Sequence, residues 1–103
     1  MRTANVFFQD TVAGQFTESE DAQQFEFVYE KDYTGPPISL TMPVRAASYE
    51  FDSFPPFFDG LLPEGFQLEA LLRVKKLDRT DKFGQLLEVG ADTVGAVTVE
   101  EVV

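Results

Sequence analysis

The chain of 103 residues contains no cysteine, no histidine and no tryptophan. Without cysteine it has no disulfide framework, no thiolate nucleophile and no zinc ribbon. Without histidine it lacks the commonest general base, the usual metal ligand and the side chain that changes charge near neutral pH. These absences favour a binding module over an enzyme, so we expect no catalytic residue, no metal site and no cofactor.

Positive charge is also scarce, because 8 Lys and Arg stand against 18 Asp and Glu, for a formal net charge of −10. Phosphate backbones repel such a chain, which argues against direct, autonomous binding of nucleic acid. No apolar run approaches the roughly 20 residues of a membrane span, and the N-terminus has no signal-peptide pattern. We therefore expect a cytoplasmic protein without membrane contact, forming a single domain over residues 1–103.

The first half of the chain has the residue pattern of β-strands. Phe25, Phe27 and Tyr29 are spaced by two, which is the period of a half-buried strand. Segments 5–9 and 12–18 flank the polar pair Asp10-Thr11, an arrangement typical of a hairpin. Weaker patterns predict short strands at residues 38–42 and 46–51.

The second half of the chain has helical spacing. Leu68, Leu71 and Leu72 predict a helix from Pro63-Glu64 to about Lys75, with this leucine stripe facing inward. Strands, then helices, then a last strand indicate an α+β fold. We expect a small, mostly antiparallel sheet of about five short strands and two to three helices in the C-terminal half. The further signals are N-caps at Asp52-Ser53 and Thr80-Asp81, a left-handed C-cap at Gly90 and a closing strand at residues 95–99.

Residues 54–66 are unusually rich in aromatic and apolar side chains, with four Phe and two Leu among three Pro and two Gly. Most of these rings are explained as caps on the core. The alternative is that one or two rings project as anchors into a partner, and Phe66, at the exposed start of a helix, is the best candidate. The candidate partner interface comprises Phe57, Asp59, Leu62, Pro63, Glu64, Gly65, Phe66 and Gln67.

Five of the eight positive charges lie within residues 73–82. One interpretation is a solvated helix end, where positive charge interacts favourably with the helix dipole. The other is contact with an acidic partner surface, or a few phosphate contacts within a larger DNA-bound assembly. This secondary basic patch comprises Arg73, Lys75, Lys76, Arg79 and Lys82. The acidic residues show no paired spacing typical of catalysis, and caps and turns explain them better.

Three segments occur in a recognisable order: 37–43 (PISLTMP), 57–64 (FFDGLLPE) and 83–97 (FGQLLEVGADTVGAV). Together they resemble the N-terminal subdomain of HipA-type serine/threonine kinase toxins. In HipA proteins the chain continues into a kinase core that carries the ATP site and the catalytic Asp. The present sequence resembles the stand-alone form, similar to the HipS antitoxin of three-gene HipBST modules, and none of the family's catalytic residues can be transferred to it.

The resemblance implies two functions that differ in their effect on a kinase. The first is an antitoxin that binds and inhibits a HipT- or HipA-type kinase toxin. The second is a structural subunit that completes a split kinase without inhibiting it, or that bridges the kinase to a HipB-like helix-turn-helix protein in a ternary complex. The implied placement puts residues 62–67 at the kinase's active-site region, with Phe66 in a pocket and Glu64 paired with a phosphate-binding Arg or Lys.

Overall fold

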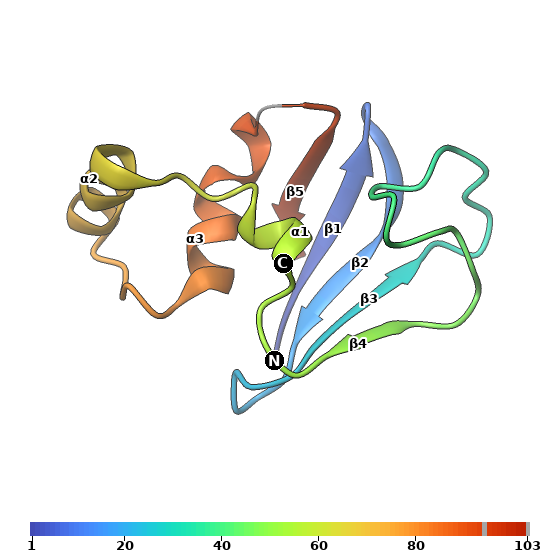
Figure 1. Ribbon diagram of the computed structural model, residues 1–103, viewed down its shortest axis with the longest axis horizontal. Coiled ribbons are helices and arrows are strands. Elements are labelled where there is room, and N and C mark those ends of the chain that lie inside the picture. The colour runs from blue at the N-terminus through green and yellow to red at the C-terminus, as the bar shows by residue number, and fades with distance from the viewer. Residues whose placement is uncertain (94, 103) are drawn as a thin grey trace.

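The computed structural model describes residues 1–93 and 95–102. Within these residues the chain forms one five-stranded sheet, three α-helices and one 3₁₀ turn, η1. The strand order is β4-β3-β2-β1-β5, and every neighbouring pair is antiparallel (Figure 1). The expected α+β fold is confirmed. The elements are β1 (Arg2–Phe8), β2 (Thr11–Glu18), β3 (Phe25–Tyr29), β4 (Tyr49–Phe51), α1 (Pro56–Asp59), α2 (Gly65–Lys75), α3 (Lys82–Val89), η1 (Gly90–Asp92) and β5 (Val97–Glu101).

A tight hairpin joins β1 to β2. Its two turn residues, Gln9 and Asp10, have φ values of 48° and 70°, and two positive φ values match the twist of the flanking strands. The turn therefore lies one residue earlier than the Asp10-Thr11 connection that the sequence indicates. The ladder register shifts between Val6 and Phe7, which leaves Ala13 as an extra, buried residue on β2.

Stacked phenylalanines join the helices to the sheet. The ring of Phe16 on β2 lies 4.0 Å from that of Phe58 on α1 and 5.2 Å from that of Phe83 on α3. All three side chains are fully buried. These contacts hold α1 and α3 against one face of the sheet. Helix α2 lies toward the opposite end of the molecule from β4 (Figure 1).

Residues 38–42 form a tight turn and not the strand that their alternation predicts. Ser39 and Met42 form one isolated bridge, and Met42 N donates to Ser39 O at 3.1 Å. Ile38 and Met42 are buried, while Leu40 at the tip is 97% exposed. The prolines on both sides of this segment have no N–H to donate, so a continuing ladder is impossible. The strand expected over residues 46–51 is also shorter than predicted, because only Tyr49–Phe51 (β4) pair with β3.

The hydroxyl groups of the three tyrosines fix the long loop between β3 and β4. Tyr29 donates to the carbonyl of Met42 and accepts from the N–H of Ile38. Tyr33 and Tyr49 donate to the carbonyls of Pro36 and Pro43, respectively. These bonds satisfy loop backbone groups that have no strand partner, so the loop has a defined shape without regular secondary structure. They were not foreseen from the sequence.

Two expected caps are wrong, and one is confirmed. Pro55 and not Asp52-Ser53 precedes α1, and it makes no side-chain cap. Gly90 has φ −59°, so it is not a left-handed C-cap. Asp81 does cap α3, because its carboxylate accepts from Gly84 N at 3.0 Å. Gly90 is required for a different reason, since a Cβ there would lie 2.3 Å from the carbonyl oxygen of Val99 on β5.

Replacing Gly90 with alanine is therefore expected to lower the free energy of unfolding by about 1–3 kcal/mol, the usual cost of overpacking. Urea denaturation measures the change. Gly60→Ala is the matched control, because Gly60 has φ −66° and an added Cβ would meet ordinary contacts at 3.4 Å or more. Equal stabilities for the two variants would contradict the close approach of η1 and β5.

Candidate partner-binding surface

The short helix α1 connects the hydrophobic core to the candidate surface. Phe58 is buried in the core, and its carbonyl accepts from Leu61 N at 3.0 Å. Leu62 N donates to Asp59 O at 3.1 Å, and both leucines are half-buried against the core. The chain leaving α1 is thus held in one position up to Leu62, immediately before the Pro-Glu-Gly sequence that opens α2.

The start of α2 presents an aromatic ring to solvent. Phe66 is 94% exposed, as the sequence predicted for this side chain. Gly65 before it has φ +58°, a conformation that favours glycine, and an added Cβ would meet nothing within 4 Å. Glu64 occupies the N-cap position, yet its exposed carboxylate makes no cap hydrogen bond. An exposed carboxylate and an exposed aromatic ring therefore stand two positions apart in the sequence, both available to a partner.

The remainder of α2 is also poorly covered. None of its eleven residues is buried, and Leu68, Leu71 and Leu72 are only half-buried. Among the described residues, none of these leucines belongs to the core cluster or to the apolar residues packed against it. The prediction that these leucines face inward is therefore only partly confirmed, because they are half-buried but do not join the core. Helix α2 lies at the edge of the domain (Figure 1).

The candidate interface separates into two groups. Phe57, Leu62 and Pro63 are half-buried and belong to the body of the domain, where the Phe57 ring packs edge-on against Phe58 with 5.1 Å between centroids. Asp59 is exposed but pairs with Lys82 at 2.9 Å. The remaining members of the candidate interface lie free at the surface: Glu64, Gly65, Phe66 and Gln67.

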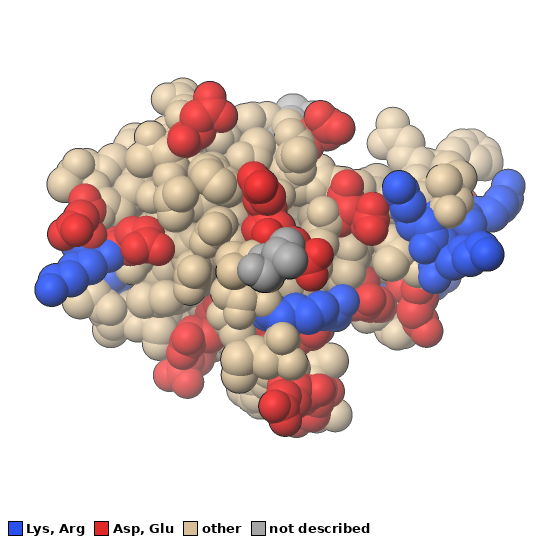
Figure 2. Space-filling model, turned by 180° about the vertical axis from the view of Figure 1, so that it is seen from behind, with Lys and Arg blue, Asp and Glu red and all other residues tan. Residues whose placement is uncertain are grey.

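The basic patch is largely neutralised within the chain. Lys75 lies 3.7 Å from Glu88, Arg79 lies 2.6 Å from Glu69, and Lys82 pairs with Asp59 as described above. Within residues 1–93 and 95–102, Arg73 and Lys76 have no carboxylate within 4 Å. Figure 2 shows the largest group of positive side chains at the end of the molecule that carries α2, and negative side chains over the whole visible face. These ion pairs were not foreseen from the sequence.

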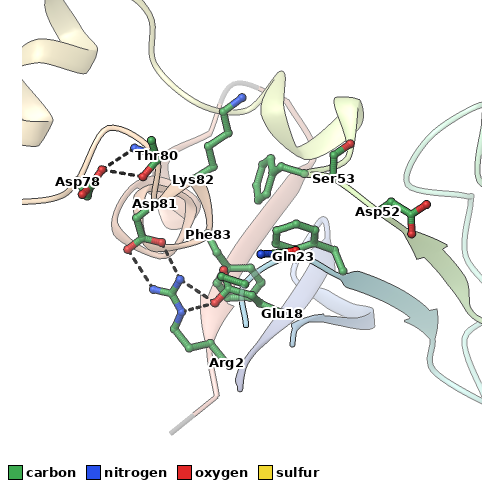
Figure 3. A pocket seen from close by; sticks show the side chains of 13 residues that line it. Arg2, Glu18, Gln23, Asp52, Ser53, Asp78, Thr80, Asp81, Lys82 and Phe83 are labelled. Atoms are coloured by element: carbon green, nitrogen blue, oxygen red, sulfur yellow. Dashed lines mark hydrogen bonds and ion pairs between the residues drawn. The ribbon is translucent and has the colours of Figure 1, made fainter. Parts of the chain in front are cut away.

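A hollow of about 740 Å³ lies between β2, the segment before α1 and the start of α3. Figure 3 shows Arg2 on its wall, between two carboxylates. Arg2 lies 2.8 Å from Glu18 and 2.6 Å from Asp81, and its guanidinium is 5.2 Å from the centre of the Phe83 ring. The hydrogen bonds that Arg2 donates to Asp81 raise the pKa of Arg2 further above its ordinary value. This network ties the first strand to α3, so we assign it a structural role.

The same network makes the stability of the domain depend on pH. The hydrogen bond from Arg2 lowers the pKa of Asp81 below its ordinary value of 3.8. Asp81 therefore stabilises the fold above about pH 4, and this contribution is lost as the pH falls through the lowered pKa. The carboxyls of Asp21 and Asp78 also have lowered pKa values, owing to hydrogen bonds in their turns, and add to the same slope.

Asp81→Asn is expected to reduce the loss of stability between pH 5 and pH 2, because asparagine keeps the cap acceptor but does not titrate. Melting temperatures across this range test the prediction. Asp10→Asn, which makes the same change of residue type in an exposed hairpin turn, provides the control. An unchanged slope in Asp81→Asn would show that the ion pair with Arg2 does not couple to folding.

Two absences bear on the chemistry of the described residues. Among residues 1–93 and 95–102, no group of three or more carboxylates is placed to hold a metal ion. No helix in the same part of the chain is long and apolar enough to cross a membrane. The surface features that bear on function are thus the exposed aromatic and acidic helix start, and the cations Arg73 and Lys76 at the other end of α2.

Comparison with known proteins identifies the family. The family model for the HipA N-terminal domain matches residues 4–100. An uncharacterised protein of Haemophilus influenzae is 33% identical over 101 residues, which cover 98% of this chain and 93% of that protein. A putative kinase of Sinorhizobium fredii, Y4mE, is 30% identical over 94% of this chain, but the match spans only 24% of the kinase.

Two solved structures have the same fold. A structure of the N-terminal domain of HipA toxin superposes with a TM-score of 0.77 at 28% identity, covering 100% of this chain and 94% of that one. A complex of HipA, HipB and operator DNA from Shewanella oneidensis contains a chain with a TM-score of 0.72 at 24% identity, covering 94% of this chain and 23% of that one. The family model covers nearly all of the chain, and the fold agrees with that of both solved structures: the chain belongs to the HipA N-terminal domain family.

Proposed function

We propose that this chain binds a HipA-type serine/threonine kinase and inhibits it, as the antitoxin of a toxin–antitoxin module. The observation that carries the proposal is the exposed Phe66 at a fixed helix start. An aromatic ring that is 94% exposed at the start of a helix is typical of an interface anchor.

The relatives support a kinase as the partner. The same domain makes up 24% of the putative kinase Y4mE, so in that protein it is part of a longer chain. Contacts between domains of one chain resemble those between separate proteins. A surface that packs on a kinase within one chain can therefore bind a kinase as a separate chain.

The chemistry of the helix start fits the active-site region of a kinase. Phe66 fills an apolar pocket there, and Glu64, whose carboxylate has no cap bond in the free chain, pairs with a phosphate-binding Arg or Lys. Residues 62–67 then occupy space that nucleotide or substrate needs. In this arrangement inhibition is a direct consequence of binding.

A second candidate function differs from the first in its effect on kinase activity. The chain supports a split kinase without inhibiting it, or bridges the kinase to a HipB-like helix-turn-helix protein. The observation that favours bridging is the positive charge at the end of α2, where Arg73 and Lys76 have no carboxylate within 4 Å among the described residues. The complex of HipA with HipB and operator DNA, which contains a similar chain, is consistent with such an assembly.

Titration of kinase activity distinguishes the two functions. Phosphorylation by the cognate HipA-type kinase is measured with increasing amounts of the chain. Inhibition predicts that activity falls until the two proteins are equimolar. A rise in activity, or tight binding without change, would replace the antitoxin with a structural subunit.

A further inference from the structure

Helix α2 has two apolar faces. With 3.6 residues per turn, Phe66, Ala70 and Val74 lie on one face, because they recur at every fourth position. The half-buried leucines described above lie on the opposite face. Phe66 is 94% exposed, Val74 is 73% exposed, and Ala70 between them is exposed as well. We call Phe66, Ala70 and Val74 the outward stripe.

The outward stripe has the spacing of a helix that binds in a groove. Such helices place apolar anchors at i, i+4 and i+7 or i+8 along one face. Isolated exposed apolar residues are common and need no explanation. Here three of them line the outer face of a helix that has no buried residue of its own and lies at the edge of the domain (Figure 1). The folded domain therefore gains little from this apolar face, which instead fits a partner.

The charges beside the outward stripe indicate the chemistry of that partner. Arg73 is seven residues after Phe66, so it lies on the same face, and Lys76 is the left-handed residue that ends the helix. Neither has a carboxylate within 4 Å among the described residues, whereas their neighbours Lys75 and Arg79 do. The chain carries −10 in total, but five of its eight positive charges lie within residues 73–82, so an acidic surface is attracted to this end more than to the rest of the chain.

We propose that the outward stripe lies in an apolar groove of the kinase, and that the rim of this groove is acidic where it meets Arg73 and Lys76. This inference rests on the proposed function and deepens it, because it names the character of the docking site. Glu64 at the other end of α2 faces a basic group of the kinase. Opposite charges at the two ends of the helix allow one orientation in the groove and disfavour the reverse.

The test measures the affinity of the cognate HipA-type kinase for variants of the full chain, at about 50 mM and 500 mM NaCl. Val74→Asp is expected to weaken binding about 30-fold or more, as loss of an interface anchor does. The double variant Arg73→Glu/Lys76→Glu is expected to weaken binding about tenfold at low salt and less at high salt, because salt screens exposed charges.

Matched controls make the same chemical changes at the opposite end of the sheet. Val44→Asp alters an apolar residue that is 41% exposed in the loop before β4, and Lys31→Glu reverses an exposed charge in the same loop. Both are expected to bind as the wild type does. Melting temperatures of all variants establish that each one is folded, which the exposure of the altered side chains favours.

The outcomes separate this inference from the proposed function. If the kinase binds the wild type and the α2 variants equally, the groove is wrong and the proposed function stands. If Arg73→Glu/Lys76→Glu binds more tightly, the rim is basic and the inference is wrong. If the wild type forms a dimer that Val74→Asp dissociates, a second copy covers the stripe instead. If the kinase does not bind the wild-type chain, both the groove and the proposed function are wrong.

Discussion

Phe66→Ala is expected to weaken binding of the partner kinase about 30-fold or more, the effect of removing an interface hot spot. The stability of the free domain is expected to change by less than about 0.5 kcal/mol, because the ring is 94% exposed and contributes no packing. Isothermal titration with the kinase and urea denaturation of the free chain measure the two quantities. Loss of affinity without loss of stability is the signature of a side chain whose role is in the complex.

Leu40→Ala is the matched control for Phe66→Ala. Leu40 is 97% exposed at the tip of the turn held by Tyr29, at the opposite end of the sheet from α2. It has the same apolar, solvent-facing character, so its removal tests whether any exposed apolar residue affects binding. We expect wild-type affinity. Equal affinities for both variants and the wild type would show that the helix start does not contact the kinase.

Phe58→Ala is expected to lower the free energy of unfolding by about 3–5 kcal/mol. The ring is fully buried, stacks on Phe16 at 4.0 Å and holds α1 to the sheet. The total free energy of unfolding of a domain of this size is about 5–15 kcal/mol, so the expected loss is a large share of its stability. Urea denaturation of the purified variant measures it, and a reduced folded fraction at 37 °C is expected to follow.

Phe57→Ala gives the comparison for Phe58→Ala within the same helix. Phe57 is half-buried and packs on the outer side of Phe58, so its removal is expected to cost about 1–2 kcal/mol. The order of the two effects follows from burial alone. A larger loss in Phe57→Ala than in Phe58→Ala would contradict the position of α1 relative to the core.

The fold was predictable where the signal is local. Residues 25–29 alternate in the sequence and in burial, and β3 spans these residues. Asp81 precedes an apolar pattern at helical spacing, and it caps α3 as expected. Such signals need only neighbours in the chain. The order of strands, then helices, then a last strand was sufficient to give the fold class.

Other features were not predictable because they depend on distant residues. Ile38, Leu40 and Met42 alternate like a strand, but flanking prolines and the hydroxyl of Tyr29 fold them into a turn. The pair of Arg2 and Asp81 joins side chains 79 residues apart, and no local pattern announces it. Gly90 looked like a cap, whereas its small size is needed for contact with β5.

The candidate surface was predicted in part. The Pro-Glu-Gly sequence indicated an exposed Phe66, and the ring is exposed. The leucines of α2 accounted for its helical period, and this concealed the second apolar face that ends at Val74. The basic patch looked uniform in the sequence, yet carboxylates on Glu69, Glu88 and Asp59 neutralise most of it. Such pairing becomes visible only when the helices are placed together.

Hydrogen–deuterium exchange of the chain, free and bound to the kinase, tests the central claim most directly. Residues 61–76 form a loop and a helix without a buried residue, so their amides are expected to exchange readily in the free chain. The account predicts that binding protects this segment and leaves the turn at 38–42 unchanged. Protection confined to that turn or to the strands, with residues 61–76 unaffected, would contradict the account.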